Sequence, residues 1–238
     1  MLTFNKDELV RYSRQMLLPE IGFAGQEKLK DAKVLVVGAG GLGCPLLQYL
    51  SAAGVGTLGI IDFDTIELHN LHRQILYASD DVGKQKAFTA ADKINRSNPN
   101  INCIVFNEKL QQSNTAQIIS QFDIVADGSD NFATRYLVND VCVKLNKPLV
   151  YGTILKFQGQ LAVFNYKGSK NLRDIYPEAP NPEDVPNCDE NGVLGIVPGI
   201  IGLMMCDHVI KIILGRKINI NKLLLFNMEN YEMKILSY

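Results

Sequence analysis

Over the first 152 residues, short apolar runs alternate with longer segments whose apolar side chains recur every three or four positions. The short runs indicate buried strands and the longer segments indicate helices. The expected strands are 34–43, which runs into glycines, 57–64, 101–106, 123–126 and 149–151, and the expected helices are 42–53, 84–95, 115–121 and 132–145. This alternation predicts an α/β fold with a Rossmann-like, doubly wound, mostly parallel sheet and helices on both faces.

The two ends of the chain depart from this alternation. Asn5 with Glu8 three residues later is a capping-box pattern, which predicts a helix from about residue 6 to 18. After Gly152, the segments 157–166 and 223–236 predict antiparallel C-terminal strands, and 198–214 predicts a buried helix ended by Gly215. Segment 168–192 is polar and aperiodic, so we expect a functional or disordered loop there.

Composition places the chain among ordinary globular proteins. Of its 238 residues, 47% are hydrophobic and 21% are charged, and the net charge is −1. This charge offers no general attraction for nucleic acid or for an anionic membrane, so neither is an expected partner. No uninterrupted apolar stretch reaches the ~18 residues of a membrane span, and the five cysteines form no CxxC pair. We therefore expect a cytoplasmic protein with free thiols.

A glycine-rich turn joins the first expected strand of the sheet to the following helix. Gly38, Gly40 and Gly43 fit the pattern GxGxxG, in which backbone N–H groups approach phosphates at a helix N-terminus. Asp62 lies 22 residues after Gly40, at a strand end where an acid can accept hydrogen bonds from ribose. This fingerprint alone suits an NAD-dependent oxidoreductase. The alternative is a purely structural role, as a tight turn that binds no ligand.

The connection after the second strand argues against hydride chemistry. It carries Asn70, Arg73 and Gln74 after Asp62 and Asp64, and Lys86 begins the next expected helix. Converging cations suit a triphosphate better than the pyrophosphate of a dinucleotide. Each cation taken alone would more often be a solvated surface charge, but their joint position beyond the strand ends favours a ligand site.

The sequence "DGSDNFATR" at 127–135 follows another strand end. Asp130 there can bind magnesium between phosphate oxygens, because Mg²⁺ prefers hard oxygen ligands. The alternative is that Asp130 or Asn131 only caps the helix that begins at Phe132. Spacing alone leaves both interpretations open.

At these motifs the sequence resembles the ThiF/MoeB/HesA family, the prokaryotic relatives of ubiquitin-activating enzymes. The matching segments are "RYSRQMLLPEIGFAGQEKLKDAKVLVVGAGGLGCP", "IIDFDTIELHNLHRQILY", "VGKQKA", "DGSDNFATRYLVND" and "GVLGIVPGIIG". The resemblance implies ATP-dependent adenylylation of the C-terminal Gly-Gly carboxylate of a ubiquitin-like sulfur-carrier protein, for thiamine or molybdopterin biosynthesis. It also implies one ThiF-type domain, with a helical arm at 1–30, a nucleotide-binding core at 31–152 and a carrier-binding part at 153–238.

The resemblance assigns a role to each matching residue. Asp130 would bind magnesium, Asp62 would face ribose, and Arg14 would reach the triphosphate of the other subunit in a homodimer. The remaining residues expected at the ATP site are Gly38, Gly40, Gly41, Gly43, Asp64, Asn70, Arg73, Gln74, Lys86 and Asn131. A separate protein would donate the sulfur, because no rhodanese-like domain follows in this sequence.

Cys188 lies in the polar loop, where family members carry a cysteine that can bond the activated carrier. The two interpretations are a covalent role and an incidental thiol, and the neighbouring Asp189 and Glu190 would raise the thiol pKa. The other four cysteines, Cys44, Cys103, Cys142 and Cys206, are expected to be buried packing residues.

Family members with structural zinc use two CxxC pairs, but "NLRD" stands at the first position here and the C-terminus has no cysteine. We expect no zinc and, as a result, a looser 168–190 segment. His69 and His72 have no suitably spaced partner ligand, so surface or packing roles are expected.

Three other functions stay open at this point. A related enzyme could adenylylate a small molecule, a peptide or a modified tRNA, although the near-zero net charge weighs against tRNA. The fold could be a non-catalytic nucleotide-binding scaffold, which the intact Arg14, Arg73, Lys86 and Asp130 argue against. The NAD-dependent oxidoreductase is the third.

Overall fold

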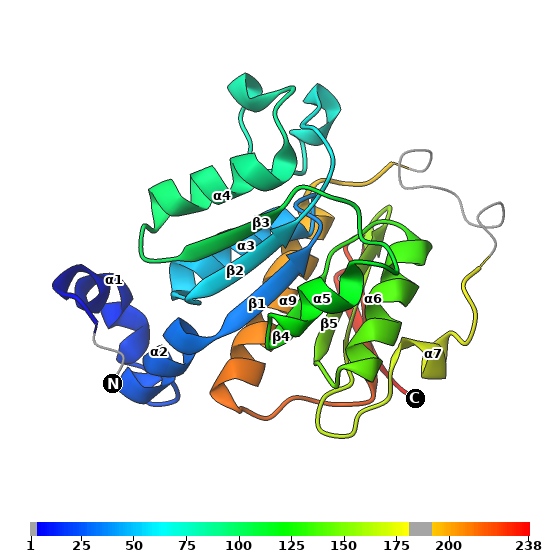
Figure 1. Ribbon diagram of the computed structural model, residues 1–238. Helices are drawn as coiled ribbons and strands as arrows, with labels where there is room; N and C mark the ends of the chain where they lie inside the picture. The colour runs from blue at the N-terminus through cyan, green and yellow to red at the C-terminus, as the bar shows by residue number, and fades with distance from the viewer. Residues whose placement is uncertain (1–3, 181–191) are drawn as a thin grey trace.

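The computed structural model describes residues 4–180 and 192–238. In this part of the chain, eight strands form one sheet in the order β3-β2-β1-β4-β5-β6-β7-β8 (Figure 1). The first five strands in this order run parallel and the last three pair antiparallel. The strands are β1 Lys33–Val37, β2 Thr57–Ile61, β3 Asn102–Phe106, β4 Ile124–Asp127, β5 Leu149–Leu155, β6 Gln158–Phe164, β7 Lys222–Asn227 and β8 Glu232–Ser237. The predicted fold class is confirmed.

Helices cover both faces of the sheet, with α5 and α6 on one face and α3 and α9 on the other (Figure 1). The helices are α1 Lys6–Met16, α2 Gly22–Asp31, α3 Gly43–Ala53, α4 Lys86–Ser97, α5 Thr115–Ser120, α6 Phe132–Lys144, α7 Leu172–Ile175 and α9 Ile196–Leu214, with short 3-10 turns η1 Leu68–Asn70 and η2 Ser79–Asp81. The helices α2 and α7 are short elements that the sequence pattern did not predict.

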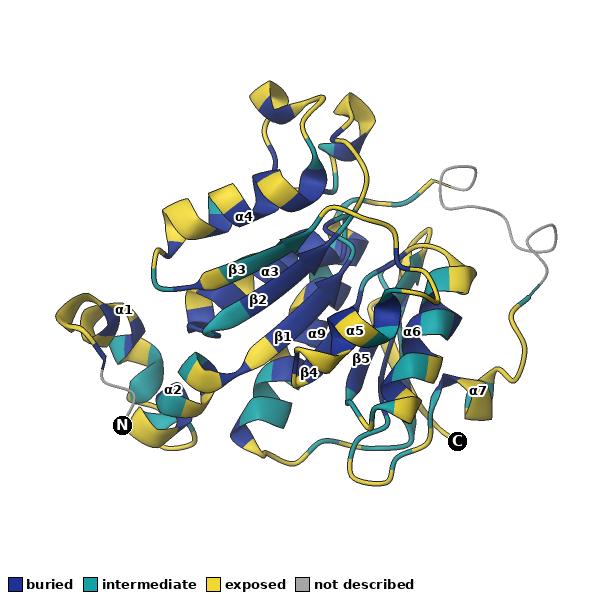
Figure 2. Cartoon of the chain, viewed as in Figure 1, coloured by how far each residue is buried: buried dark blue, intermediate teal, exposed yellow. Residues whose placement is uncertain are grey.

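Alternate residues of the central strands point to opposite faces and build two cores. Val34 and Val36 of β1 pack in the larger core with α3, α4 and α9, whereas Leu35 and Val37 pack in the smaller core with α5 and α6. In Figure 2, β1 and β2 are dark after their first residues, Lys33 and Thr57, because helices exclude water from both faces of the sheet there. Continuous apolar runs in the sequence follow from this double burial.

The helix α9 is long and apolar enough, by length and composition, to cross a membrane. In this fold it packs on β5, β6 and α3 instead. Val197, Ile201, Met205 and Val209 on its inner side are fully buried. The helix begins at Ile196, two residues before the predicted start at 198, and its predicted end is confirmed, because Gly215 caps it in the left-handed conformation with φ 68°. The inner side of α9 therefore belongs to the protein core, while Ile196 and Leu203 on the same helix stay exposed.

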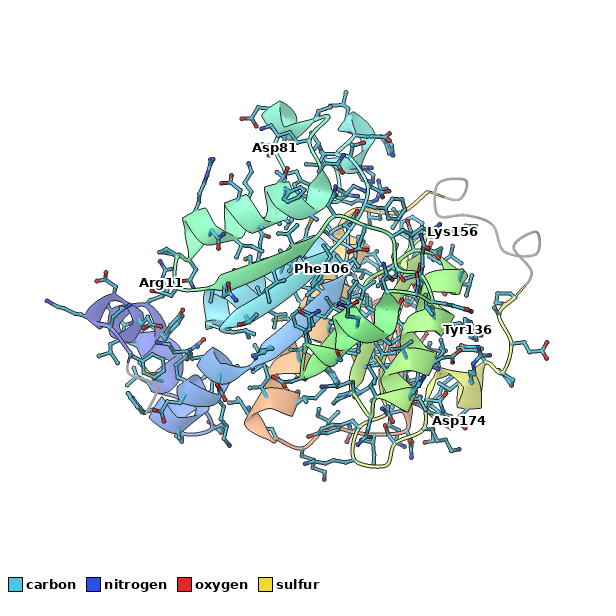
Figure 3. All side chains as sticks on the ribbon, viewed as in Figure 1. Arg11, Asp81, Phe106, Tyr136, Lys156 and Asp174 are labelled. Carbon is cyan, nitrogen blue, oxygen red and sulfur yellow. The ribbon has the colours of Figure 1, made fainter. Side chains whose placement is uncertain are left out.

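The N-terminal helical arm lies at the amino ends of the parallel strands. The predicted capping box of α1 is present, because the Glu8 N–H donates to the Asn5 side chain at 2.8 Å and the Asn5 N–H donates to Glu8 at 2.9 Å. The Arg11 guanidinium donates to the Ser97 carbonyl oxygen at 3.0 Å, just before β3 begins (Figure 3 labels Arg11). The arm is thus fixed at the amino ends of the parallel strands, far from their carboxyl ends.

The described part of the polar loop, 168–180, is fastened to α6, which differs from the expectation of a looser segment. Arg173 donates to both carboxylate oxygens of Asp140, at 2.7 and 2.8 Å. The Tyr136 hydroxyl (labelled in Figure 3) donates to the carbonyl oxygens of Tyr176 and Glu178. An ion pair and side-chain hydrogen bonds hold this stretch, and residues 181–191 lie outside the described residues.

Burial of the cysteines follows the expectation with one correction. Cys44, Cys142 and Cys206 are buried, as predicted. Cys103 is only half-buried, because it lies on β3, the strand at the edge of the sheet, which has a neighbouring strand on one side only.

Candidate functional site

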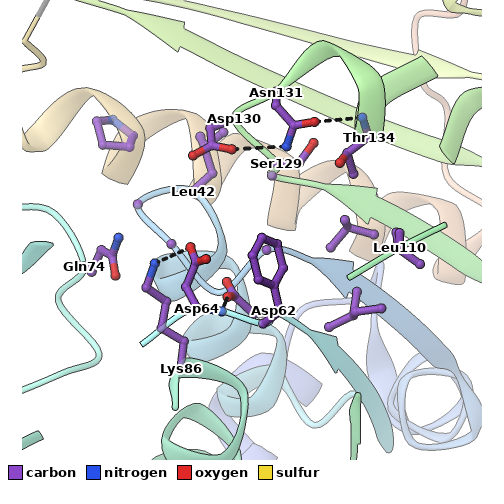
Figure 4. Close-up of a pocket in the computed structure, with 18 of the residues that line it drawn as sticks. Leu42, Asp62, Asp64, Gln74, Lys86, Leu110, Ser129, Asp130, Asn131 and Thr134 are labelled. Atoms are coloured by element: carbon purple, nitrogen blue, oxygen red, sulfur yellow. Dashed lines mark hydrogen bonds and ion pairs between the residues drawn. The ribbon is translucent and has the colours of Figure 1, made fainter. Parts of the chain in front are cut away.

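A cavity of about 300 Å³ opens at the carboxyl ends of β1, β2 and β4 (Figure 4). The chain leaves β1 toward one side of the sheet and returns as β4 on the other, so the cavity lies where the strand order reverses. Open α/β sheets bind ligands at such a point. Of the residues predicted from the sequence, the cavity wall contains Gly38, Gly40, Gly41, Asp62, Asp64, Arg73, Gln74, Lys86, Asp130 and Asn131.

The glycine turn after β1 forms the floor of the cavity. Gly38 adopts φ 86°, a left-handed conformation that favours glycine. A Cβ on Gly43 would collide with the Gly38 carbonyl oxygen, so Gly43 is needed for close contact between the turn and α3. A Cβ on Gly40 would meet nothing nearer than the Gln74 amide nitrogen at 3.6 Å, so this glycine leaves open space in the cavity.

Three side chains hold the turn in place through Ala39. The Ala39 N–H donates to the Asp62 carboxylate at 2.8 Å, and the Tyr77 hydroxyl donates to the Ala39 carbonyl oxygen at 2.8 Å. The Cys44 thiol donates to the same oxygen at 3.3 Å. Because both polar groups of Ala39 are occupied, the turn is rigid before any ligand arrives.

Asp62 links the turn to the connection after β2. Its second carboxylate oxygen accepts the Asp64 N–H at 2.9 Å. Burial raises the pKa of Asp62 above its ordinary value, and the nearby charge of Lys86 opposes that rise. Carboxylate oxygens can accept further hydrogen bonds, so Asp62 remains suited to ribose hydroxyls.

Two cations reach the cavity from the connection between β2 and α4. The side chain of Lys86 is 8% exposed, and its Nζ lies 2.9 Å from an Asp64 carboxylate oxygen. This burial excludes the interpretation of Lys86 as a solvated surface charge. Arg73 is half-buried, its guanidinium donates to the His69 carbonyl oxygen at 3.1 Å, and its stem lies beside Gly41.

Hydrogen bonds in the loop after β4 show which of its residues caps α6 and which is left to bind a metal ion. Asn131 caps α6, because its side-chain oxygen accepts the Thr134 N–H at 2.9 Å. Asp130 makes no capping bond in the described chain, and its one hydrogen bond there is a long one, 3.4 Å, from the Asn131 amide. Asp130 therefore presents a solvated carboxylate to the cavity, across from the Lys86–Asp64 pair (Figure 4).

Four predicted residues lie elsewhere or are not described. Gly43 lies behind the turn, as its contact with Gly38 requires. Asn70 is buried, and its side-chain oxygen accepts the Glu67 N–H at 3.1 Å, so here it stabilises the η1 turn rather than the cavity wall. Arg14 is exposed on α1, at the opposite edge of the sheet. Cys188 lies outside the described residues.

The cavity also includes residues that the sequence patterns did not single out. Glu108, Lys109 and Leu110 come from the chain after β3, and Phe63 faces the Lys109 ammonium at 5.7 Å. Others are Ser129, Thr134 and Arg135, beside the predicted Asp130. The strand order could have indicated the residues after β3, because β3 is parallel to β2 and its carboxyl end lies on the same side of the sheet as the cavity.

The residues present fit a nucleoside triphosphate with magnesium. The open space at Gly40 admits a phosphate, and the Gln74 amide nitrogen, a hydrogen-bond donor, lies beside that space, 3.6 Å from where a Gly40 Cβ would stand. Asp130 is one free carboxylate, which suits a magnesium ion held mainly by phosphate oxygens and water. Among residues 4–180 and 192–238, no three His, Cys, Asp or Glu side chains gather as a metal-binding group.

The sequence matches the ThiF family over residues 12–237. The chain belongs to the ThiF family. Its relatives include the adenylyltransferase and sulfurtransferase MOCS3 of Danio rerio, 50% identical over 228 residues, or 95% of this chain and 50% of that protein. The probable molybdopterin-synthase adenylyltransferase of Porphyra purpurea is 48% identical over 90% of this chain and 56% of its own length. The sulfur carrier protein adenylyltransferase of Thermus thermophilus is 47% identical over 90% of this chain and 81% of its own length.

Solved structures share the fold at lower identity. Escherichia coli MccB crystallised with ATP superposes with a TM-score of 0.82 at 23% identity, covering 95% of this chain and 71% of that chain. The PaaA structure gives a TM-score of 0.84 at 22% identity, covering 100% of this chain and 75% of that chain. These structures confirm the ThiF-type arrangement of strands and helices.

Proposed function

We propose that the protein is an adenylyltransferase that uses ATP and magnesium to activate the C-terminal Gly-Gly carboxylate of a ubiquitin-like sulfur-carrier protein. The observation that carries this proposal is the composition of one cavity: an open glycine turn at its floor, the cations Lys86 and Arg73 at one side, and the free carboxylate of Asp130 at the other. A triphosphate with magnesium is the ligand that needs all three.

The names of the relatives support this substrate class. The Thermus protein is named a sulfur carrier protein adenylyltransferase and the Porphyra protein a probable molybdopterin-synthase adenylyltransferase, both at more than 45% identity. The chain spans about half the length of the MOCS3 and Porphyra relatives. At 22–23% identity, MccB supports the fold alone, so the carrier protein is favoured over a peptide substrate.

The charges in the cavity account for the chemistry. A carboxylate is ionised at neutral pH and is itself the nucleophile, so its attack on the α-phosphate needs no general base. The barrier lies in bringing two anions together and in releasing pyrophosphate. Lys86 and Arg73 are placed to neutralise negative charge as it moves onto the leaving group. Bound magnesium, held by Asp130, would supply further charge neutralisation of the phosphate oxygens.

The helical arm before the nucleotide core has a proposed role in assembly. Arg14 is exposed on an arm far from the carboxyl ends of the strands, which suits a contribution to the cavity of a second subunit rather than its own. We propose a homodimer on this basis, with sulfur supplied by another protein. Thiamine and molybdopterin biosynthesis are both compatible with the cavity, and the relatives' names favour molybdopterin.

Carrier-dependent exchange of pyrophosphate into ATP tests the proposal. Purified protein is mixed with magnesium, ATP, labelled pyrophosphate and each candidate carrier ending in Gly-Gly. Exchange is expected only with a carrier whose terminal carboxylate is intact, and Arg73→Ala or Asp130→Ala should lower it about 10²–10³-fold without unfolding the protein. Exchange that persists without a carrier, or near-normal exchange in both variants, would contradict the proposal.

A further inference from the structure

A buried guanidinium that the proposed reaction does not use lies against the loop between β4 and α6. Arg135 lies in the first turns of α6, and only 6% of its surface is exposed. Its Nε and Nη2 both donate to the Ser129 carbonyl oxygen, at 3.2 and 2.9 Å. The guanidinium also lies over two rings, 5.3 Å from the centre of Phe132 and 5.7 Å from that of Tyr151. Aromatic contact and two hydrogen bonds fix its orientation.

The Ser129 carbonyl belongs to the peptide unit that continues into Asp130. A peptide unit is planar, so two hydrogen bonds to the carbonyl oxygen also set the direction of the Asp130 N–Cα bond. On the other side of Asp130, Asn131 is held as the N-cap of α6. On the side toward β4, the Ser129 N–H donates to the buried Asp127 carboxylate at 2.9 Å. The backbone is thus held on both sides of Asp130, while the Asp130 carboxylate faces the cavity and accepts only the long hydrogen bond from Asn131 among the described residues.

The backbone of this loop is also bonded to β1, because the Gly128 N–H donates to the Val37 carbonyl oxygen at 2.9 Å. The Ser129 hydroxyl and the second carboxylate oxygen of Asp127 are buried and have no hydrogen-bond partner among the described residues. Within the described chain, Arg135 is the side chain that donates to the Ser129 carbonyl oxygen and so restrains the Ser129–Asp130 peptide.

We propose that Arg135 is a positioning residue that presents the Asp130 carboxylate to a divalent cation bound with the nucleotide. This proposal rests on the proposed function, because it assumes that Asp130 binds the metal. Residues that orient a metal ligand typically change metal affinity 10–100-fold when they are lost. Lysine is not equivalent at this position, since an ammonium lacks the planar fork that reaches one carbonyl twice and stacks on rings.

Equilibrium binding of Mn²⁺, measured by electron paramagnetic resonance with a non-hydrolysable ATP analogue present, tests the proposal without relying on activity. The variants are Arg135→Gln and Arg135→Lys, each also made with Asp130→Asn. The control is Arg173→Gln, which removes a guanidinium that is likewise stacked, 4.9 Å from the Tyr136 ring centre, and bound twice to one partner, Asp140, but lies outside the cavity wall.

We expect Arg135→Gln to weaken Mn²⁺ binding roughly 10–100-fold, Arg173→Gln to leave it unchanged, and Arg135→Gln to add little once Asp130 is already Asn. Wild-type affinity in Arg135→Gln, or an equal loss with and without the Asp130 carboxylate, overturns the positioning role alone. Absence of nucleotide-dependent Mn²⁺ binding by the wild-type protein overturns the proposed function as well. Should Arg135→Gln not fold, Arg135→Lys is judged by the same outcomes.

Discussion

Replacing Lys86 by methionine separates catalysis from stability. Methionine keeps most of the apolar stem and removes the charge, while Asp64, whose side chain is 46% exposed, is left in contact with water. An ion pair with one solvated partner is worth about 0.2–1 kcal/mol. In a chain of this size, 1 kcal/mol lowers the melting temperature by about 2–4 °C, so Lys86→Met should melt within a few degrees of the wild type.

The expected loss of activity is much larger. If the buried ammonium neutralises charge on the leaving pyrophosphate, its removal costs about 2.7–4 kcal/mol in the transition state, or roughly 10²–10³ in rate. Carrier-dependent pyrophosphate exchange and thermal melting, measured on the same sample, show the two effects together.

Lys84→Met is the matched control. Lys84 also forms an ion pair, 3.0 Å from Asp81, but its side chain is 56% exposed and lies outside the cavity wall. Asp81 keeps its second partner, Lys93, at 2.7 Å. This variant should retain wild-type exchange. Near-normal exchange in Lys86→Met, or an exchange loss no greater than that of Lys84→Met, would refute the assignment of Lys86 to the reaction.

Three further predictions concern other parts of the chain. The Gly40→Ala protein should fold normally, but its ATP affinity, measured by calorimetry, should fall roughly 10–100-fold. The new Cβ enters the open cavity and displaces hydrogen bonds worth about 1.5–3 kcal/mol. The control is Gly199→Ala, in open space on α9, which should leave ATP affinity unchanged. Burial alone would raise the pKa of Asp81, but hydrogen bonds from Lys93, the Ala78 N–H and Lys84 outweigh it and lower the pKa. Ionised Asp81 therefore stabilises the fold above the ordinary pKa of about 3.9, and the stabilisation is lost as pH falls through the lower folded-state value; Asp81→Asn should cost about 1–3 kcal/mol in urea unfolding at pH 7, and a cost that does not shrink in acid would contradict this. Burial raises the thiol pKa of Cys44 and of Cys206 to about 12, so iodoacetamide near neutral pH should leave both unmodified in the native protein by peptide mass spectrometry, and rapid labelling of either would contradict their burial.

The sequence was sufficient for the elements whose burial is complete. The central strands β1, β2 and β4 are covered on both faces, so their apolar runs are continuous and easily recognised. The residues that begin and end helices were equally easy to recognise, as the N-cap Asn5 of α1 and the C-cap Gly215 of α9 show. The helix α2 was missed because its sequence, "GFAGQEKLKD", contains two glycines and buries few apolar side chains.

Individual site residues were harder to predict because their roles depend on neighbours that are distant in sequence. The pair of Lys86 with Asp64 spans 22 positions, and only the fold shows that Lys86 is buried. Asn131 and Asp130 were indistinguishable by spacing until the hydrogen bond to Thr134 identified the cap. Arg135 resembles an ordinary helix cation, since nothing in the local pattern shows that its guanidinium folds back onto Ser129.

The central claim is that this cavity binds the triphosphate of ATP. Isothermal titration of the wild-type protein with ATP and with NAD, in the presence of magnesium, tests it most directly, with Gly40→Ala and Lys86→Met titrated in parallel. The account predicts stoichiometric ATP binding, strongly weakened in both variants, and no NAD binding. Binding of NAD without binding of ATP, or ATP affinity unchanged in both variants, would contradict it.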